Sequence, residues 1–117
     1  MEINIKIKSM LSETNVYADS KKNILIINDK QIATDVGLFS DKVISIFKEL
    51  KQVIMPYSTD ISIYSIKILN GTHTYLLDGS ALDENFYKLT DLITNTLKAD
   101  YDFAPLTYKL NAKGGVK

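Results

Sequence analysis

The dipeptide Asn70-Gly71 lies between two stretches of alternating polarity, and no other feature constrains the fold of this chain as strongly. Both central residues of a type I′ turn need positive φ, which asparagine and glycine adopt readily. Asn-Gly between strand-like runs therefore predicts a β-hairpin with a two-residue loop. We expect residues 61–78 to form its two antiparallel strands.

A two-residue loop at this position also determines which residues face each other, for example Leu69 with Thr72 and Ile66 with Tyr75. Side chains alternate between the two faces of a strand, so this pairing defines two sets of residues. The set expected to pack on the core is Tyr64, Ile66, Ile68, His73, Tyr75 and Leu77. The set expected to meet water or a partner is Ser65, Lys67, Leu69, Thr72, Thr74 and Leu76.

Four further strands are predicted before the hairpin. Residues 3–7 alternate isoleucine with polar residues, and Val16 to Ala18 resembles a short strand. Residues 24–27 form a continuous apolar run, which predicts a strand covered on both faces. Residues 31–34 are expected to return as a short strand after a turn.

Two amphipathic helices are predicted from three- and four-residue spacing of apolar residues. Ser40 is the expected N-cap of the first, which should end at Pro56, and Asp83 is the expected N-cap of the second. Asp78-Gly79 is interpreted as the turn that follows the hairpin. The stripe of the first helix is Val43, Ile46, Phe47, Leu50 and Ile54, and that of the second is Phe86, Leu89, Ile93 and Leu97.

Together these elements predict an α+β fold: an antiparallel sheet of about five to six strands with two amphipathic helices on one face, in the order β-β-β-α-β-β-α. The length of 117 residues suits one domain, expected over 1–111, with a final edge strand at 106–110 and a flexible tail at 112–117. The expected core is Ile5, Ile24, Ile26, Ile46, Phe47, Leu50, Ile66, Ile68, Tyr75, Leu77, Phe86, Leu89 and Ile93.

Charge and composition exclude several functional classes. Fourteen lysines balance fourteen acidic residues, so no net field attracts nucleic acid or anionic lipid. Arginine is absent, which removes the side chain best suited to bidentate recognition of phosphate or guanine. No apolar run is long enough to span a membrane, and residues 1–6 alternate like a strand rather than a signal peptide. With no cysteine present, we expect a cytoplasmic protein.

No catalytic, cofactor or metal site is predicted. His73 is the only histidine, which excludes two-histidine metal sites and leaves a partly buried structural role as the expectation. Residues 100–102 hold two carboxylates, but the glycine and the terminal glutamate of a calcium loop are missing around them. Asp78 and Asp83 are interpreted as turn and cap residues.

The element order over residues 38–98 resembles the latter half of emfourin-type inhibitors of metalloproteases. The likeness consists of a helix, the hairpin strand Tyr64 to Gly71, a second strand and the amphipathic helix 86–97. The glycine-rich N-terminal segment of that family is absent, so no inhibitory residue is carried over. The resemblance implies a protein that works by binding another protein.

The predicted function is that of a small non-enzymatic protein that binds and blocks a partner protein, as inhibitors, immunity proteins and phage or mobile-element antagonists do. The expected contacts are Tyr101, Asp100, Asp102, Tyr108, Lys67 and Thr74. Tyrosine suits such surfaces because it offers a large contact area with few torsions to order. The alternatives are a nucleic-acid-associated accessory protein, using lysines near Tyr108, and a small enzyme or enzyme subunit. Homodimerisation through an exposed strand is compatible with all three.

Overall fold

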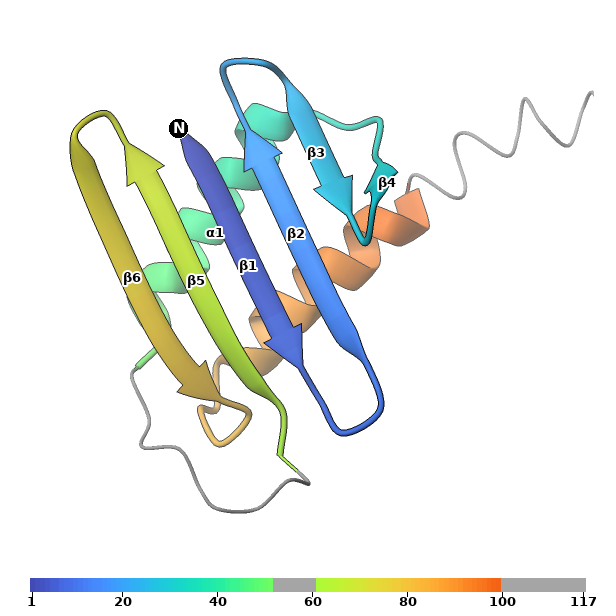
Figure 1. The fold of residues 1–117 in the computed structure, drawn as a ribbon, viewed down its shortest axis with the longest axis vertical. Coiled ribbons are helices and arrows are strands. Elements are labelled where there is room, and N and C mark those ends of the chain that lie inside the picture. Colours follow the sequence, from blue (N-terminus) through green and yellow to red (C-terminus); the bar gives the residue numbers. More distant parts are fainter. Residues whose placement is uncertain (52–60, 100–117) are drawn as a thin grey trace, which may run out of the picture.

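The structure is a computed structural model and describes residues 1–51 and 61–99. Within these ranges six strands form one antiparallel sheet, and two helices cover one of its faces (Figure 1). The predicted α+β class and the two-layer arrangement are therefore confirmed. Residues 106–110 and 112–117, predicted as a strand and a tail, lie outside the described residues.

The sheet contains two groups of strands separated in the sequence by a helix. The elements are β1 (Glu2–Lys8), β2 (Glu13–Asp19), β3 (Ile24–Ile27), β4 (Lys30–Gln31), α1 (Val36–Glu49), β5 (Ile63–Asn70) and β6 (His73–Ser80). A second helix follows over 86–99. The spatial order β4-β3-β2-β1-β5-β6 makes β1 a central strand.

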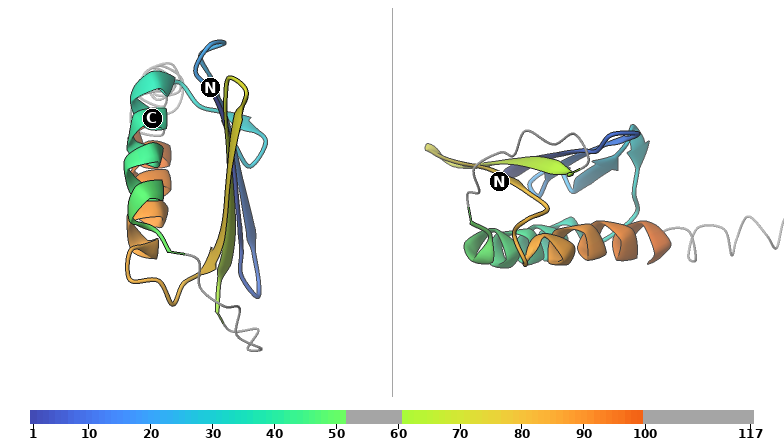
Figure 2. Two further views of the ribbon diagram at one scale, coloured as in Figure 1. Left: turned by 90° about the vertical axis from the view of Figure 1, so that its left-hand side faces the viewer. Right: turned by 90° about the horizontal axis from the view of Figure 1, so that it is seen from below.

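Apolar residues at alternate positions of the central strands form the sheet side of the core. Ile5 lies opposite Val16 on one side and Ile66 on the other, and all three are buried. Both helices lie in one layer against this face (Figure 2). They contribute Val43 from α1 and Leu89 from the second helix, each fully buried. No helix in the described ranges is long and apolar enough to cross a membrane.

The hairpin has the predicted faces but a shifted loop. Its loop is Gly71-Thr72 rather than Asn70-Gly71, because Asn70 is already paired with His73. Of the turn residues only Gly71 has positive φ, 64°, which is the pattern of a type II′ turn. The shift moves the pairing by two positions, so each side chain keeps its predicted face.

The pairing of Tyr64 with Gly79 provides a reason for this register. The tyrosine ring lies over Gly79, where an added Cβ would come within 2.8 Å of its Cε2 atom. The ring also stacks on Phe86, with centroids 5.6 Å apart, and its hydroxyl donates to the carbonyl of Lys51 at 3.3 Å. The prediction of a turn at Asp78-Gly79 is wrong, since both residues belong to β6.

The first helix begins earlier than predicted. Asp35 is its N-cap, and the Asp35 carboxylate accepts a hydrogen bond from the backbone N–H of Leu38 at 3.0 Å. Ser40, the predicted cap, lies inside the helix and is fully buried. The helix ends at Glu49. Ile54, the last residue of the predicted apolar stripe, lies outside the described residues.

Asp83, the predicted N-cap of the second helix, lies in the turn before that helix, which begins only at residue 86, so its predicted capping position is wrong. The buried Asp83 carboxylate accepts a hydrogen bond from the backbone N–H of Asn85 at 2.8 Å and from that of Lys51 at 2.6 Å. The Asn85 side chain donates to the carbonyl of Glu49 at 3.2 Å, and Lys88 forms an ion pair with Glu49. These contacts join the end of α1 to the start of the second helix.

The prediction that β3 is covered on both faces is wrong. Leu25 and Ile27 are buried beneath the helices, whereas Ile24 and Ile26 point to the other side and are only half-buried. Ile24 and Ile26 therefore leave the predicted core. Since β3 neighbours β2 on one side and only the two-residue β4 on the other, it lies near a margin of the sheet.

Candidate functional site

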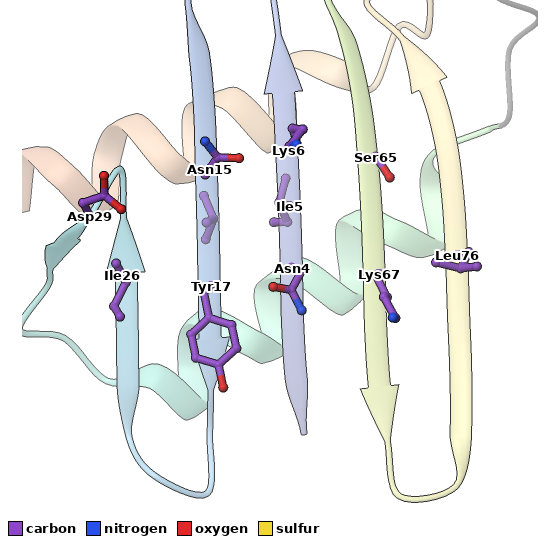
Figure 3. A pocket seen from close by; sticks show the side chains of 11 residues that line it. Asn4, Ile5, Lys6, Asn15, Tyr17, Ile26, Asp29, Ser65, Lys67 and Leu76 are labelled. Atoms are coloured by element: carbon purple, nitrogen blue, oxygen red, sulfur yellow. The ribbon is translucent and has the colours of Figure 1, made fainter.

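The face of the sheet opposite the helices carries a shallow hollow of about 430 Å³ (Figure 3). We call this side the open face, because no described helix covers it. The hollow runs across the strands from the β3–β4 turn to β6, as its lining residues Asp29 and Leu76 show.

Short polar side chains in the centre of the sheet create the hollow. Asn4 on β1 lies opposite Tyr17 and Lys67, and Asn15 on β2 lies opposite Lys6. The neighbouring strand β5 contributes only Ser65 at the level of Lys6. Short side chains thus alternate with long ones across the three strands, and the surface is low at the short ones.

Apolar side chains close the hollow at both ends. Ile26 on β3 is half-buried at one end, and Leu76 on β6 is 67% exposed at the other. Figure 3 shows the Tyr17 side chain between Ile26 and the centre. A surface with apolar margins and a polar middle can bind a partner by both kinds of contact.

Two lysines occupy the middle of the hollow. Lys6 and Lys67 lie on the neighbouring strands β1 and β5, two residues apart in register, so they are diagonal neighbours. Within residues 1–51 and 61–99 neither ammonium group has a carboxylate within ion-pair distance. Both are exposed, so they place two positive charges at the centre of the open face.

Acidic groups near the rim are held by their own neighbours. The Tyr17 hydroxyl donates to Glu2 at 2.9 Å, and this bond raises the pKa of Tyr17. The side chain of Asn15 donates to Glu13 at 3.0 Å; this bond, followed by the charges of two nearby lysines, Lys6 among them, lowers the pKa of Glu13. The hydrogen bond to Glu2 fixes the position of the Tyr17 ring at the margin of the hollow.

Of the six predicted contact residues, the structure describes two, and both lie on the predicted face. Lys67 lines the hollow, and Thr74 lies on the same face, nearer the hairpin loop. The remaining four, Asp100, Tyr101, Asp102 and Tyr108, lie outside the described residues. Whether they join Lys67 and Thr74 stays a prediction.

Sequence reasoning missed the part of the hollow formed by β1 and β2. Asn4, Lys6, Asn15 and Tyr17 were recognisable as polar positions of strands, but not as neighbours of Lys67. Their neighbourhood depends on the pairing of β1 with β5, which joins segments about sixty residues apart. No local pattern reports that pairing.

His73 and Tyr75 are more exposed than predicted. Tyr75 is 47% exposed, and His73 is exposed beside it, with the two ring centroids 6.3 Å apart. Both point to the helix side, as expected, but α1 crosses the sheet away from the hairpin loop (Figure 1). A groove of about 290 Å³ lies between Tyr75 and the side chains of Ile44 and Phe47 of α1. Tyr75 therefore leaves the predicted core.

The hollow does not bring an acid and a base together. Asp29 lines it together with Lys6 and Lys67, but β2 lies between the strands of Asp29 and Lys6, and both β2 and β1 lie between those of Asp29 and Lys67. Three inter-strand steps of about 4.8 Å separate the backbones of β3 and β5 by roughly 14 Å. No group of three or more potential metal-binding side chains occurs among the described residues.

Comparison with known proteins adds no family to this picture. No known family model matches the chain, and no curated protein or solved structure is similar enough to count as a match. The likeness to emfourin-type inhibitors stays one of element order. The geometry of the open face is thus the basis for a functional proposal.

Proposed function

We propose that this protein acts by binding another protein through the open face of its sheet and blocks that partner. The observation that carries the proposal is the hollow with Lys6 and Lys67 at its centre and Ile26 and Leu76 at its ends. Apolar contacts at the ends would supply affinity, and the lysines would orient the partner. The activity is non-catalytic and is placed in the cytoplasm, in keeping with a chain that has no cysteine.

The charge of the hollow specifies the partner's chemistry. Lys6 and Lys67 are adjacent and lack described ion-pair partners. A partner that presents one or two carboxylates between apolar side chains would match them. Exposed charges of this kind raise the rate of association more than the final affinity, so binding should weaken moderately with salt.

The same surface suits nucleic acid less well. Single-stranded nucleic acid is bound by aromatic rings that stack on bases within a basic groove. The hollow offers one aromatic ring, Tyr17, whose hydroxyl is bonded to Glu2. Asp29 lines the far end and would repel phosphate. These features favour a protein partner.

Charge reversal tests the proposal. The chain carrying Lys6→Glu and Lys67→Glu would be compared with the wild type and with a control carrying Lys22→Glu and Lys42→Glu, which are exposed elsewhere. Each would be cross-linked in an extract of the native host, captured and analysed by quantitative mass spectrometry. We expect one protein that is enriched by the wild type and the control and reduced at least about tenfold by the open-face variant, because the new glutamates would repel the carboxylates of the partner.

Two results would contradict the proposal. One is an identical set of captured proteins for all three chains. The other is retention on a mixed DNA and RNA column that is lost steeply with salt and abolished by the open-face variant, because such behaviour indicates phosphate contacts. The second result would support the nucleic-acid alternative.

A further inference from the structure

Strand β6 is an edge strand of the sheet that the described residues form. The order β4-β3-β2-β1-β5-β6 places β5 on one side of β6, and no described strand pairs with its other side. The opposite edge is the two-residue strand β4, whereas β6 has eight residues. A long edge strand is a template for pairing with another chain.

One hydrogen bond establishes which backbone groups face outward. The N–H of Ala81 donates to the carbonyl of Ser62 at 2.8 Å, so odd-numbered residues at this end of β6 direct their backbone groups towards β5. The register between β5 and β6 is uninterrupted, and backbone direction alternates along a strand. Thr74, Leu76 and Asp78 therefore present their N–H and C=O groups to the open edge.

The edge lacks the features that usually prevent pairing. Proteins protect edge strands with lysine, proline, bulges or very short strands. Strand β6 has the sequence HTYLLDGS, with no lysine and no proline, and its register contains no bulge. Asp78 is its one charged residue at neutral pH.

Apolar side chains flank the edge on both faces. Leu76 is 67% exposed on the open face, and Tyr75 is 47% exposed on the helix side. The far end of the strand differs, because Gly79 and Ser80 are buried. A second strand would therefore find its most accessible pairing positions around residues 74–78.

We propose that a second copy of this chain pairs with β6 in antiparallel fashion, with the two-fold axis at Leu76. Outward-facing residues must pair with outward-facing ones, so Leu76 lies opposite Leu76 of the second copy and Thr74 opposite Asp78. On the helix side Tyr75 lies opposite Leu77. The two sheets become one continuous sheet.

Self-complementarity is the reason for choosing a second copy as the partner. The two-fold pairing places apolar residues opposite apolar ones on both faces. It also places the Asp78 carboxylate opposite the Thr74 hydroxyl of the second copy rather than opposite another Asp78. An axis at Asp78 would bring two carboxylates together, which is unfavourable. The centre at Leu76 also avoids the buried end of the strand.

Dimerisation goes beyond the proposed function and enlarges its site. Leu76 closes the hollow at its β6 end, and in the dimer that residue contacts its equivalent. The two open faces then form one surface with two hollows. Because strand pairing covers only one edge of each chain, we expect a dimer that dissociates in the micromolar range, at the weak end of specific interfaces.

Sedimentation velocity over a range of concentrations tests the dimer directly. We expect a monomer–dimer equilibrium for the wild type and for Leu11→Lys, which alters an apolar residue on the β1–β2 loop that is 90% exposed. Leu76→Lys should weaken association at least about tenfold, because two ammonium groups would meet at the axis. Thr74→Pro removes one outward N–H without changing Leu76, and it should also weaken the association of the two copies.

Cross-linking tests the position of the axis. The chain has no cysteine, so Leu76→Cys and Leu11→Cys each introduce a unique thiol. A short bis-maleimide should join two copies of the Leu76→Cys variant at concentrations where the Leu11→Cys variant stays unlinked. A wild type that stays monomeric at millimolar concentration, or a dimer that neither Leu76→Lys nor Thr74→Pro weakens, would overturn the proposal. Equal cross-linking of both cysteine variants would do so too.

Discussion

The two faces of the sheet use the same strands but are held in place by different forces. On the covered face, isoleucine, leucine and valine are packed against two helices, and shape decides which residue fits. On the open face, asparagine, serine and lysine line the hollow, and no described helix packs on them. Adjacent residues of a strand thus experience different constraints.

This difference separates what stabilises the protein from what it can offer a partner. Removal of a buried methyl group costs transfer energy and leaves a cavity. Most exposed substitutions away from special features change stability by only about 0.5 kcal/mol. The open face can therefore change its side chains freely while the covered face keeps the fold.

Strand β3 offers the sharpest test, because Ile26 and Ile27 are adjacent and face opposite sides. We expect Ile27→Ala to lower the free energy of unfolding by about 2–5 kcal/mol and Ile26→Ala by about 1 kcal/mol or less. Urea denaturation followed by circular dichroism measures both. Equal losses would mean that β3 is covered on both sides.

The covered face also depends on the absence of a side chain at Gly79. A methyl group there overlaps the ring of Tyr64, so Gly79→Ala should cost about 1–3 kcal/mol. Gly37→Ala is the control, since an added Cβ meets only the Asp35 carboxylate at an ordinary 3.4 Å. That variant should be neutral or more stable by up to about 1 kcal/mol. Similar stabilities for both variants would show that Tyr64 does not need Gly79.

The start of α1 gives a smaller effect. Asp35→Ala removes the N-cap and should cost about 1 kcal/mol. Ser40→Ala should be neutral or stabilising, because the buried Ser40 hydroxyl has no hydrogen-bond partner among the described residues. Thermal unfolding of the two variants measures the difference. The reverse order would place the helix start at Ser40.

The last comparison concerns two tyrosines on opposite faces. Burial, reinforced by Asp83, raises the pKa of Tyr64 to about 12, whereas the bond to Glu2 raises the pKa of Tyr17. A raised pKa means that the folded chain keeps a proton which the unfolded chain loses near pH 10. The stability contributed by Tyr64 is therefore complete below pH 10 and is lost as the pH rises to about 12.

Absorbance titration at low and at about 1 M salt distinguishes the two causes. The difference between wild type and Tyr64→Phe should persist in salt, because burial is not screened. The difference between wild type and Tyr17→Phe should shrink, because the hydrogen bond that raises the pKa of Tyr17 is made to the charged carboxylate of Glu2 at a partly exposed site, where salt weakens the attraction. The same salt response for both tyrosines would contradict this assignment.

Much of the covered face could be predicted from the sequence because its signals are local. The alternation of residues 3–7 predicted β1, and the apolar stripe of 86–97 predicted the second helix. The hairpin faces were correct although the loop was displaced by one residue. Since Asn-Gly accommodates more than one turn type, the choice depended on Tyr64 lying over Gly79, a contact across two strands.

The candidate site could be predicted only in part. Lys67 and Thr74 were assigned to the correct face, because a shift of two residues preserves the alternation. Lys6 and Tyr17 were not assigned to the same surface, because their proximity depends on strand order. The helix start was missed because Asp35 and Ser40 are both good caps, and Gly37 in the first turn disfavours the longer helix locally.

The central position of β1 has a consequence for synthesis. Its partner β2 follows at once, but its other partner, β5, ends only at Asn70. Until the ribosome has released that residue, β1 has no strand paired with its second edge. Ile3 and Ile5 then lack the apolar neighbours that β5 provides in the folded protein. Contacts between distant segments form slowly and leave such edges open to aggregation. A nascent chain stalled before residue 63 should therefore depend on chaperones more than the completed protein does.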